Sequence, residues 1–163
     1  IRYFLIQPFY VKGASMEPNF YDHEYLIIDE ISYRFNGPER GDIIVFRYPL
    51  NPQEYFSKRV FGLPGEEIQI KDGEVVIFNK EDPEGVALDE PYLAQGAKTY
   101  GLSDEKISLG DNDFYVLGDN RSSSKDSRSF GPVNKSYIIG RVMLRGWPFN
   151  RAQVFETPQY SYQ

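Results

Sequence analysis

The sequence predicts a mainly β fold, and three observations support this prediction. Apolar residues recur with a period of two or in short continuous runs, which is typical of strands. No long segment has a convincing helical period. Asp72-Gly73 lies between two of the apolar runs, and it indicates a hairpin because a two-residue type I′ turn needs positive φ at both positions.

Six segments in order are predicted to be strands, because each combines β-branched or aromatic residues with turn residues at its ends. They are residues 24–31, 42–48, 66–72, 74–79, 113–119 and 137–145. Residues 80–112 are instead rich in Asp, Glu, Gly and Pro, which indicates a cap inserted into one β core. We therefore expect the first part of the core at 1–79, the inserted cap subdomain at 80–112, and the second part with a C-terminal tail at 113–163.

Length, composition and charge limit the possible functions. The 163 residues are 40% apolar, which is enough for one globular domain with a small subdomain. A formal net charge of −6 argues against a nucleic-acid partner, because phosphates need a basic footprint. The absence of cysteine excludes thiol catalysis, disulfides and cysteine-ligated zinc. Residues 111–120 offer carboxylates without the spacing of a calcium loop, which argues against a metal site there.

Histidine is nearly absent, which restricts the possible serine chemistry. A Ser-His-Asp triad needs a histidine beside the serine, and the chain contains only His23. His23 stands between Asp22 and Glu24 in a predicted turn, a pattern that favours a surface imidazole. If Ser15 is a nucleophile, its base must therefore be a carboxylate or a lysine.

Ser15 lies in "GASMEP", residues 13–18. Gly13 and Ala14 would let an extended peptide lie close to the backbone. Pro18 restricts the chain just after the serine, and Met16 offers a flexible apolar surface. These features suit a nucleophile that binds a peptide, but this stretch by itself favours an ordinary polar turn between two strands.

Lys58 and Arg59 are consecutive in "YFSKRVFGLPGEE", residues 55–67. Their side chains must point to opposite faces of a strand, and Lys58 shares its face with Phe56 and Val60. Apolar surroundings lower the pKa of a lysine and can make its amine a base. The alternative is a lysine whose stem covers apolar surface while its ammonium reaches water; the strand pattern leaves both open.

The stretch "GDNRSSSKDSRSFGP", residues 118–132, alternates acids, arginines and hydroxyls after an apolar strand. One interpretation is a solvated loop with exposed ion pairs of little energetic weight. The other is a buried framework, in which Asp119 or Asp126 pairs with Arg59 or Arg128. In that case the hydroxyl of Ser124 would orient the lysine amine.

These three stretches and "RGDIIVFRYP", residues 40–49, resemble the motifs of bacterial type I signal peptidases, the membrane-bound leader peptidases. "GASMEP" is similar to the nucleophile box, "RGDIIVFRYP" to the β-strand box, "SKRVFGLPGE" to the base box and "GDNRSSSKDSRSFGP" to the last box. The four occur in the family's order and span nearly the whole chain. The resemblance implies the family's catalytic β core with a small inserted β and loop cap.

The resemblance also implies a role for each matching residue. Ser15 takes the place of the nucleophile, Lys58 that of the general base, and Ser124 that of the hydroxyl that orients the lysine. The framework positions are Arg59, Asp119, Asp126 and Arg128.

Two positions depart from the family's usual pattern. Many members carry a hydroxyl two residues before the nucleophile as an oxyanion donor, whereas this chain has Gly13 there. Glycine leaves the oxyanion to main-chain donors, as in another branch of the family. Asn19 replaces the usual threonine after Pro18, a change expected to affect local hydrogen bonding more than chemistry.

The implied activity is that of a serine endopeptidase, which cleaves signal peptides after small residues at Ala-x-Ala-like sites by way of an acyl-enzyme. This chemistry needs no metal and no organic cofactor. Shallow apolar pockets would reject larger residues by steric blockage, because a hydrophobic pocket discriminates one methylene by only about 1 to 3 kcal/mol. The residues at the substrate-binding positions are Phe9, Val11, Gly13, Met16, Phe20, Val45 and Phe56. Ordinary core packing is the alternative for the apolar ones.

The first eleven residues, "IRYFLIQPFYV", resemble the segment that links the family's transmembrane helix to its catalytic domain. We therefore expect a single N-terminal anchor upstream of Ile1, and a catalytic domain on the extracytoplasmic face of a bacterial plasma membrane. The expected partners are preprotein signal peptides, the membrane lipid surface and nearby protein export machinery. Two alternatives stay open: a Ser-Lys self-cleaving repressor-type protease, and a non-catalytic homologue that only binds peptides.

Overall fold

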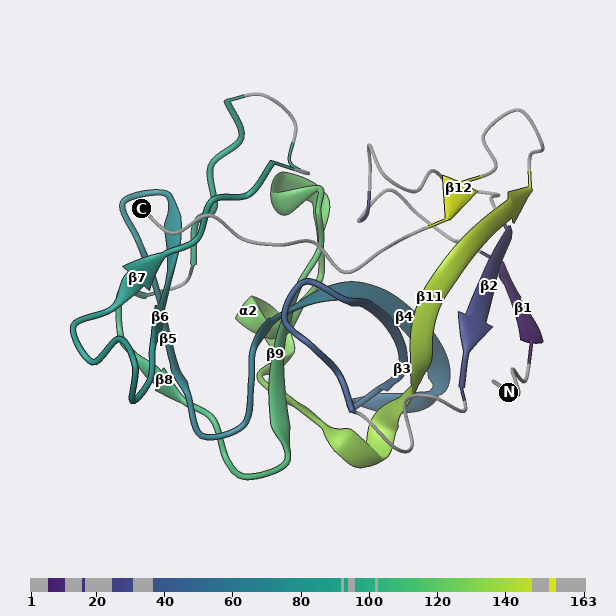
Figure 1. The fold of residues 1–163 in the computed structure, drawn as a ribbon, viewed down its shortest axis with the longest axis horizontal. Coiled ribbons are helices and arrows are strands. Elements are labelled where there is room, and N and C mark those ends of the chain that lie inside the picture. Colours follow the sequence, from purple (N-terminus) through teal and green to yellow (C-terminus); the bar gives the residue numbers. More distant parts are fainter. Residues whose placement is uncertain are drawn as a thin grey trace.

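Antiparallel β-sheets make up most of the fold, as the sequence predicts (Figure 1). The structure is a computed structural model. It describes residues 6–10, 16, 25–30, 37–91, 93, 96–101, 103–147 and 153–154, with the backbone alone at 6–10, 25–27, 144–147 and 153–154. Within these residues, no helix is long and apolar enough to cross a membrane.

The strands and short helices follow one another along the chain in a single order. The strands are β1 (Ile6–Tyr10), β2 (Tyr25–Asp29), β3 (Ile43–Tyr48), β4 (Asn51–Gly62), β5 (Glu67–Lys71), β6 (Glu74–Phe78), β7 (Val86–Ala87), β8 (Ile107–Ser108), β9 (Asp113–Leu117), β10 (Val133–Asn134), β11 (Ile138–Trp147) and β12 (Gln153–Val154). The helices are η1 (Arg121–Ser123), α2 (Ser127–Phe130) and η2 (Lys135–Tyr137). Each of the six predicted strands is confirmed, with ends that differ by one or two residues.

The larger sheet has eight strands, in the order β1-β2-β11-β3-β4-β9-β10 with β12 paired to β11. Strand β4 lies between β3 and β9, where Lys58 pairs with Ile44 and Arg59 with Ile43 on one side and Leu117 on the other. The first half of β4 is exposed and the second half is buried. The pairing therefore places Lys58 and Arg59 in the centre of the sheet.

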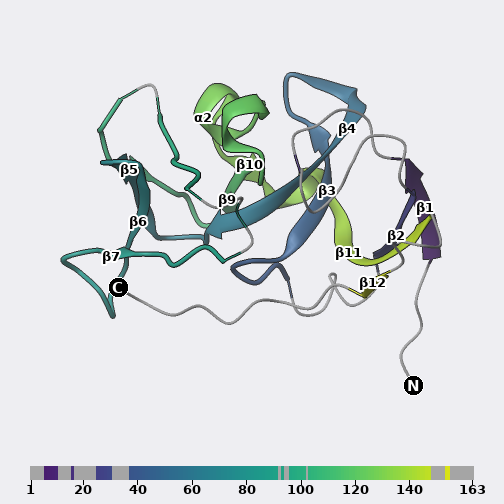
Figure 2. The ribbon, with the colours of Figure 1, turned by 90° about the horizontal axis from the view of Figure 1, so that it is seen from above.

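The smaller sheet has four strands, in the order β7-β6-β5-β8. It lies at the opposite end of the molecule from β1 and β2 in both views (Figures 1 and 2). The predicted hairpin turn between β5 and β6 is confirmed, because Lys71 pairs with Glu74 while Asp72 and Gly73 have φ of 52° and 79°.

The expected start of the inserted cap differs from the sheet that the structure shows. We placed the beginning of the cap at residue 80, whereas the four-stranded sheet already includes β5 and β6 and starts at Glu67. The apolar pattern of these two strands predicts that they are strands without predicting which sheet they join. The division of the chain into domains stays a prediction.

Within the part of the chain that the structure describes, apolar side chains form three buried clusters. One joins the two sheets, with Phe61 of β4 and Tyr115 of β9 packed against residues of β5 and β6. The other two contain side chains from both faces of β3, because Val45 belongs to one and Phe46 to the other. Strands β3 and β4 are therefore covered by apolar side chains on both sides, which removes Lys58 and Arg59 from water.

Candidate active site

Lys58 lies in the buried half of β4 with only 4% of its surface exposed. Its Nζ is 5.0 Å from the centroid of the Phe56 ring, and Val60 packs in the same apolar cluster as Phe56. These are the two neighbours that strand alternation predicts. The sequence left open whether the ammonium of Lys58 reaches water or lies in apolar surroundings. The structure supports the second interpretation, a buried amine.

Burial lowers the pKa of Lys58 from 10.5 to about 8, because the charged ammonium is removed from water. Two carboxylates, first Asp126 and then Asp119, act in the opposite direction by favouring the charged form. The desolvation effect is the larger of the two influences. About a tenth of such a lysine is neutral at pH 7, compared with roughly 0.03% of one with the ordinary pKa.

Arg59 points to the other face and forms a buried bidentate ion pair with Asp119. Its Nε and Nη2 donate hydrogen bonds of 2.8 and 2.7 Å to the two carboxylate oxygens, and Nη1 donates to the carbonyl of Gly41 at 2.9 Å. Both side chains are almost completely buried. The pair attaches the beginning of the 118–128 loop to the strand that carries Lys58.

Asp126 and Arg128 form the second bidentate pair, at the other end of that loop. Nε and Nη2 of Arg128 donate to the carboxylate of Asp126 at 2.8 and 2.7 Å. The same carboxylate accepts from the backbone N–H groups of Gly118 and of Arg128, at the start of α2. The structure therefore pairs Arg59 with Asp119 and Arg128 with Asp126, which is one of the pairings that the sequence left open. The role of these four residues as a catalytic framework stays a prediction.

Ser124 lies between the two ion pairs along the chain. Its Oγ is buried, and the structure shows no hydrogen-bond partner for it. Buried hydroxyls normally have a partner, so this one is unusual among the described residues. Its role in orienting the lysine stays a prediction.

The proposed nucleophile Ser15 lies outside the described residues, as do Val11, Gly13, Phe20 and the alternative candidate His23. The residue that follows Ser15 is described. Met16 is buried, and its sulfur accepts a hydrogen bond of 3.3 Å from the backbone N–H of Asp119. The chain next to Ser15 therefore contacts the Arg59–Asp119 pair.

The predicted pocket residues fall into different places. Met16 and Val45 share a buried cluster with Ile43, so their side chains are brought together. Phe56 packs on the opposite face of the sheet, against Phe46. Phe9 lies in β1, but its side chain is outside the described ones. The role of all four in binding substrate stays a prediction.

A third buried ion pair contacts the same loop, and the sequence analysis assigned it no role. Arg121 pairs with Glu90, and its Nη1 donates to Oγ1 of Thr99 at 2.5 Å. Glu90 and Thr99 come from the polar segment 80–112, where nothing in the pattern distinguishes a buried acid from a solvated one. Arg121 belongs to the last box, and that position was a sequence signal for its importance.

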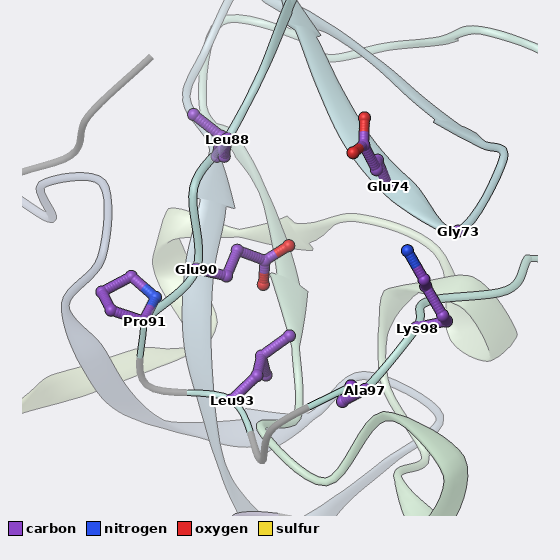
Figure 3. Close-up of a pocket in the computed structure, with 9 residues that line it drawn as sticks. Gly73, Glu74, Leu88, Glu90, Pro91, Leu93, Ala97 and Lys98 are labelled. Carbon is purple, nitrogen blue, oxygen red and sulfur yellow. The ribbon is translucent and has the colours of Figure 1, made fainter. Parts of the chain in front are cut away.

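A pocket of about 400 Å³ lies beside this third pair, in the region of the smaller sheet (Figure 3). Glu90 lines it, together with Glu74 of β6 and Lys98. The sequence predicts no function for these residues.

The family model described as "Signal peptidase, peptidase S26" matches residues 1–147 of this chain. Signal peptidase I of Leptolyngbya laminosa is 43% identical over 159 residues, which cover 93% of this chain and 73% of the relative. Probable signal peptidase I-2 of Synechocystis is 38% identical, covering 93% of this chain and 67% of the relative. Signal peptidase IB of Staphylococcus aureus is 32% identical, and the match covers 96% of this chain and 85% of the relative.

A solved structure is also similar to this chain. The crystal structure of a signal peptidase I from Enterococcus faecalis superposes with a TM-score of 0.53 and 31% sequence identity. The match covers 65% of this chain and 97% of the crystallised chain. The sequence comparisons and the structural comparison therefore agree, because both find signal peptidases.

Proposed function

Because this chain belongs to the signal peptidase family, peptidase S26, and is a serine endopeptidase that cleaves signal peptides, we propose that Ser15 and Lys58 form its catalytic dyad. The observation that carries the proposal is the burial of Lys58, whose pKa falls to about 8. A general base is most effective when its pKa is near the working pH. A lysine with the ordinary pKa is almost fully protonated at neutral pH and could not act as the general base.

In the proposed mechanism, neutral Lys58 takes the proton of the Ser15 hydroxyl as Oγ attacks the scissile carbonyl carbon. The resulting ammonium gives this proton to the leaving amine, and an acyl-enzyme remains on Ser15. Lys58 then takes a proton from water, which attacks the ester carbonyl. The ammonium returns this proton to the Ser15 oxygen as the acyl–oxygen bond breaks and the signal peptide is released. The oxyanion is stabilised by main-chain donors near Ser15, each worth about 3 to 4 kcal/mol in sites of this kind.

The two bidentate pairs support the proposal by fixing the surroundings of Lys58. The Arg59–Asp119 and Asp126–Arg128 pairs hold both ends of the 118–128 loop, and Ser124 lies between them. We propose that the free lone pairs of the Ser124 hydroxyl orient the lysine amine. This buried oxygen has no hydrogen-bond partner in the structure, so its lone pairs are available to the amine.

The substrate is proposed to be a preprotein with small residues at an Ala-x-Ala-like site. Met16 and Val45 would form part of the pocket wall, because their side chains pack together and Met16 directly follows Ser15 in the chain. We also propose that the enzyme works at the extracytoplasmic face of the bacterial plasma membrane, close to the export machinery, where signal peptides emerge.

The test is cleavage of a preprotein by Ser15→Ala and Lys58→Ala variants. Each should lose cleavage by at least about 1,000-fold while its circular dichroism spectrum is unchanged. An acylating serine reagent should modify the wild-type protein at Ser15, as detected by mass spectrometry. Full cleavage by either variant would refute the dyad, and the absence of any adduct would favour the peptide-binding homologue. Cleavage of the chain itself, with no cleavage of preprotein, would indicate the repressor-type alternative.

A further inference from the structure

Outside the four framework residues, Arg121 of the 118–128 loop uses all of its guanidinium nitrogens in hydrogen bonds. It lies in η1, two residues after Asp119, and its side chain is 1% exposed. Nε donates to the carbonyl of Gly118 at 2.8 Å, Nη1 donates to Oγ1 of Thr99 at 2.5 Å, and Nη2 pairs with Glu90. All three guanidinium nitrogens therefore have acceptors, one within the loop and two in the segment 90–99.

Further contacts attach the same two segments. The guanidinium of Arg121 lies 4.8 Å from the ring of Phe61, three residues beyond Lys58 in β4. Arg128 donates from Nη2 to the carbonyl of Arg121 at 2.8 Å and from Nη1 to the carbonyl of Tyr100 at 3.0 Å. The loop is thus bound to residues 90–100 by two arginines as well as to β4 by Arg59.

We propose that Arg121, held by Glu90 and Thr99, is a positioning residue that fixes the 118–128 loop over the general base. The segment 90–100 then belongs to the support of the active site. This inference rests on the proposed function, because Lys58 must be the base for the position of the loop to affect the rate.

The physical reason is the exclusion of water. The loop supplies Asp119 and Asp126, the two carboxylates that favour the charged form of Lys58, and both are neutralised by their arginines. Desolvation outweighs these carboxylates. If the loop moves and admits water, the amine regains solvation, its pKa rises, and less of it is neutral at a given pH.

The geometry also identifies conservative variants for a test. Lysine in place of Arg121 keeps the charge but cannot reproduce three nitrogens in a planar fork. Glu90→Gln keeps the shape of the side chain and removes its charge. Glu90 faces the pocket shown in Figure 3, so the substitution causes no overpacking. Thr99→Val removes one acceptor at nearly constant volume.

The experiment measures kcat, KM and the pH profile of preprotein cleavage for the wild type, Arg121→Lys, Glu90→Gln and the double variant. We expect Arg121→Lys to lower kcat/KM by about 10- to 100-fold, mainly through kcat, because a displacement of about 1 Å can have this effect. The rise of activity with pH should move to higher pH by about 0.5 or more. The kcat/KM of the double variant should be only slightly lower than that of Arg121→Lys. The reason is that both substitutions disrupt the same ion pair, between Arg121 and Glu90.

The matched control is Arg40–Glu66, a largely buried bidentate pair whose hydrogen bonds to the described residues run to Phe61, Leu63 and Asn79. Arg40→Lys and Glu66→Gln should lower thermal stability and leave the pH profile unchanged. If Arg121→Lys also lowers stability alone, with an unchanged pH profile, Arg121 is structural and the inference is wrong. If Arg121→Lys does not fold, Glu90→Gln and Thr99→Val replace it. A pH profile that moves to higher pH in these variants supports the inference, and a loss of stability with an unchanged pH profile refutes it. Activity retained by Lys58→Ala would instead refute the proposed function.

Discussion

The backbone N–H of Asp119 donates a hydrogen bond to the sulfur of Met16, although the two residues are 103 positions apart. Asp119 is also the partner of Arg59, the residue next to Lys58 in β4. This hydrogen bond and the Arg59–Asp119 pair together connect the chain beside the proposed nucleophile to the strand that carries the proposed base. Its distance of 3.3 Å is normal for a sulfur acceptor.

Met16→Leu tests this connection, because leucine keeps the volume and removes the acceptor. A thioether is a weak acceptor, so we expect the free energy of unfolding to fall by about 1 kcal/mol. The activity should fall several-fold, since the contact adjoins Ser15. Urea denaturation and preprotein cleavage measure the two effects. Met143→Leu, at the other methionine and in β11, is the control and should change stability by less than about 0.5 kcal/mol. Equal losses in the two variants would contradict a role for the sulfur.

The cleavage rate should depend on the protonation of Lys58. Only the neutral amine is a base, and its pKa is about 8. We therefore expect kcat/KM to rise about tenfold per unit of pH below 8 and to level off above it. Lys58→Arg should be inactive throughout, because a guanidinium stays protonated in this range. A flat wild-type profile between pH 6 and 9, measured with a peptide substrate that does not titrate, would exclude Lys58 as the titrating base.

Lys58 should also make the stability depend on pH. Its pKa is 10.5 in the unfolded chain and about 8 in the folded protein, so the unfolded chain binds more protons between these values. The corresponding stability is complete above the unfolded pKa and is lost as the pH falls through 8. Lys58→Met abolishes this titration. We expect the stability of the variant relative to wild type to be about 2 to 3 kcal/mol greater at pH 7 than at pH 10, by urea denaturation.

Lys106→Met provides the control for this measurement. Lys106 is exposed and also lies over an aromatic ring, with its Nζ 3.9 Å from the centroid of Phe78. Its relative stability should change by less than about 0.5 kcal/mol between the two pH values. A similar change in both lysine variants would show that burial of Lys58 is not the cause.

The sequence predicted what depends on local periodicity. Alternation along residues 55–60 placed Lys58 beside Phe56 and Val60, and the structure confirms this apolar environment. Asp72-Gly73 predicted its turn, because few other dipeptides accept positive φ twice. Each of these inferences needs only the neighbouring residues.

Pairings between distant segments could not be predicted in the same way. The sequence offered Asp119 and Asp126 as partners for either arginine, and only the path of the loop decides that Arg59 takes Asp119. Glu90 is one of many acids in a polar segment, and its burial depends on how that segment packs against Arg121. Tertiary structure, rather than local pattern, selects these contacts.

Ser124→Ala separates catalysis from stability. The buried Oγ of Ser124 has no hydrogen-bond partner, so removing it should leave the stability unchanged or raise it by up to about 1 kcal/mol. The cleavage rate should nevertheless fall about tenfold or more if this hydroxyl orients the amine of Lys58. Ser127→Ala is the matched control, because Oγ of Ser127 accepts the buried N–H of Val116 at 2.9 Å. That variant should lose about 1 to 3 kcal/mol of stability. Wild-type activity in Ser124→Ala, measured by preprotein cleavage beside urea denaturation of both variants, would remove Ser124 from the mechanism.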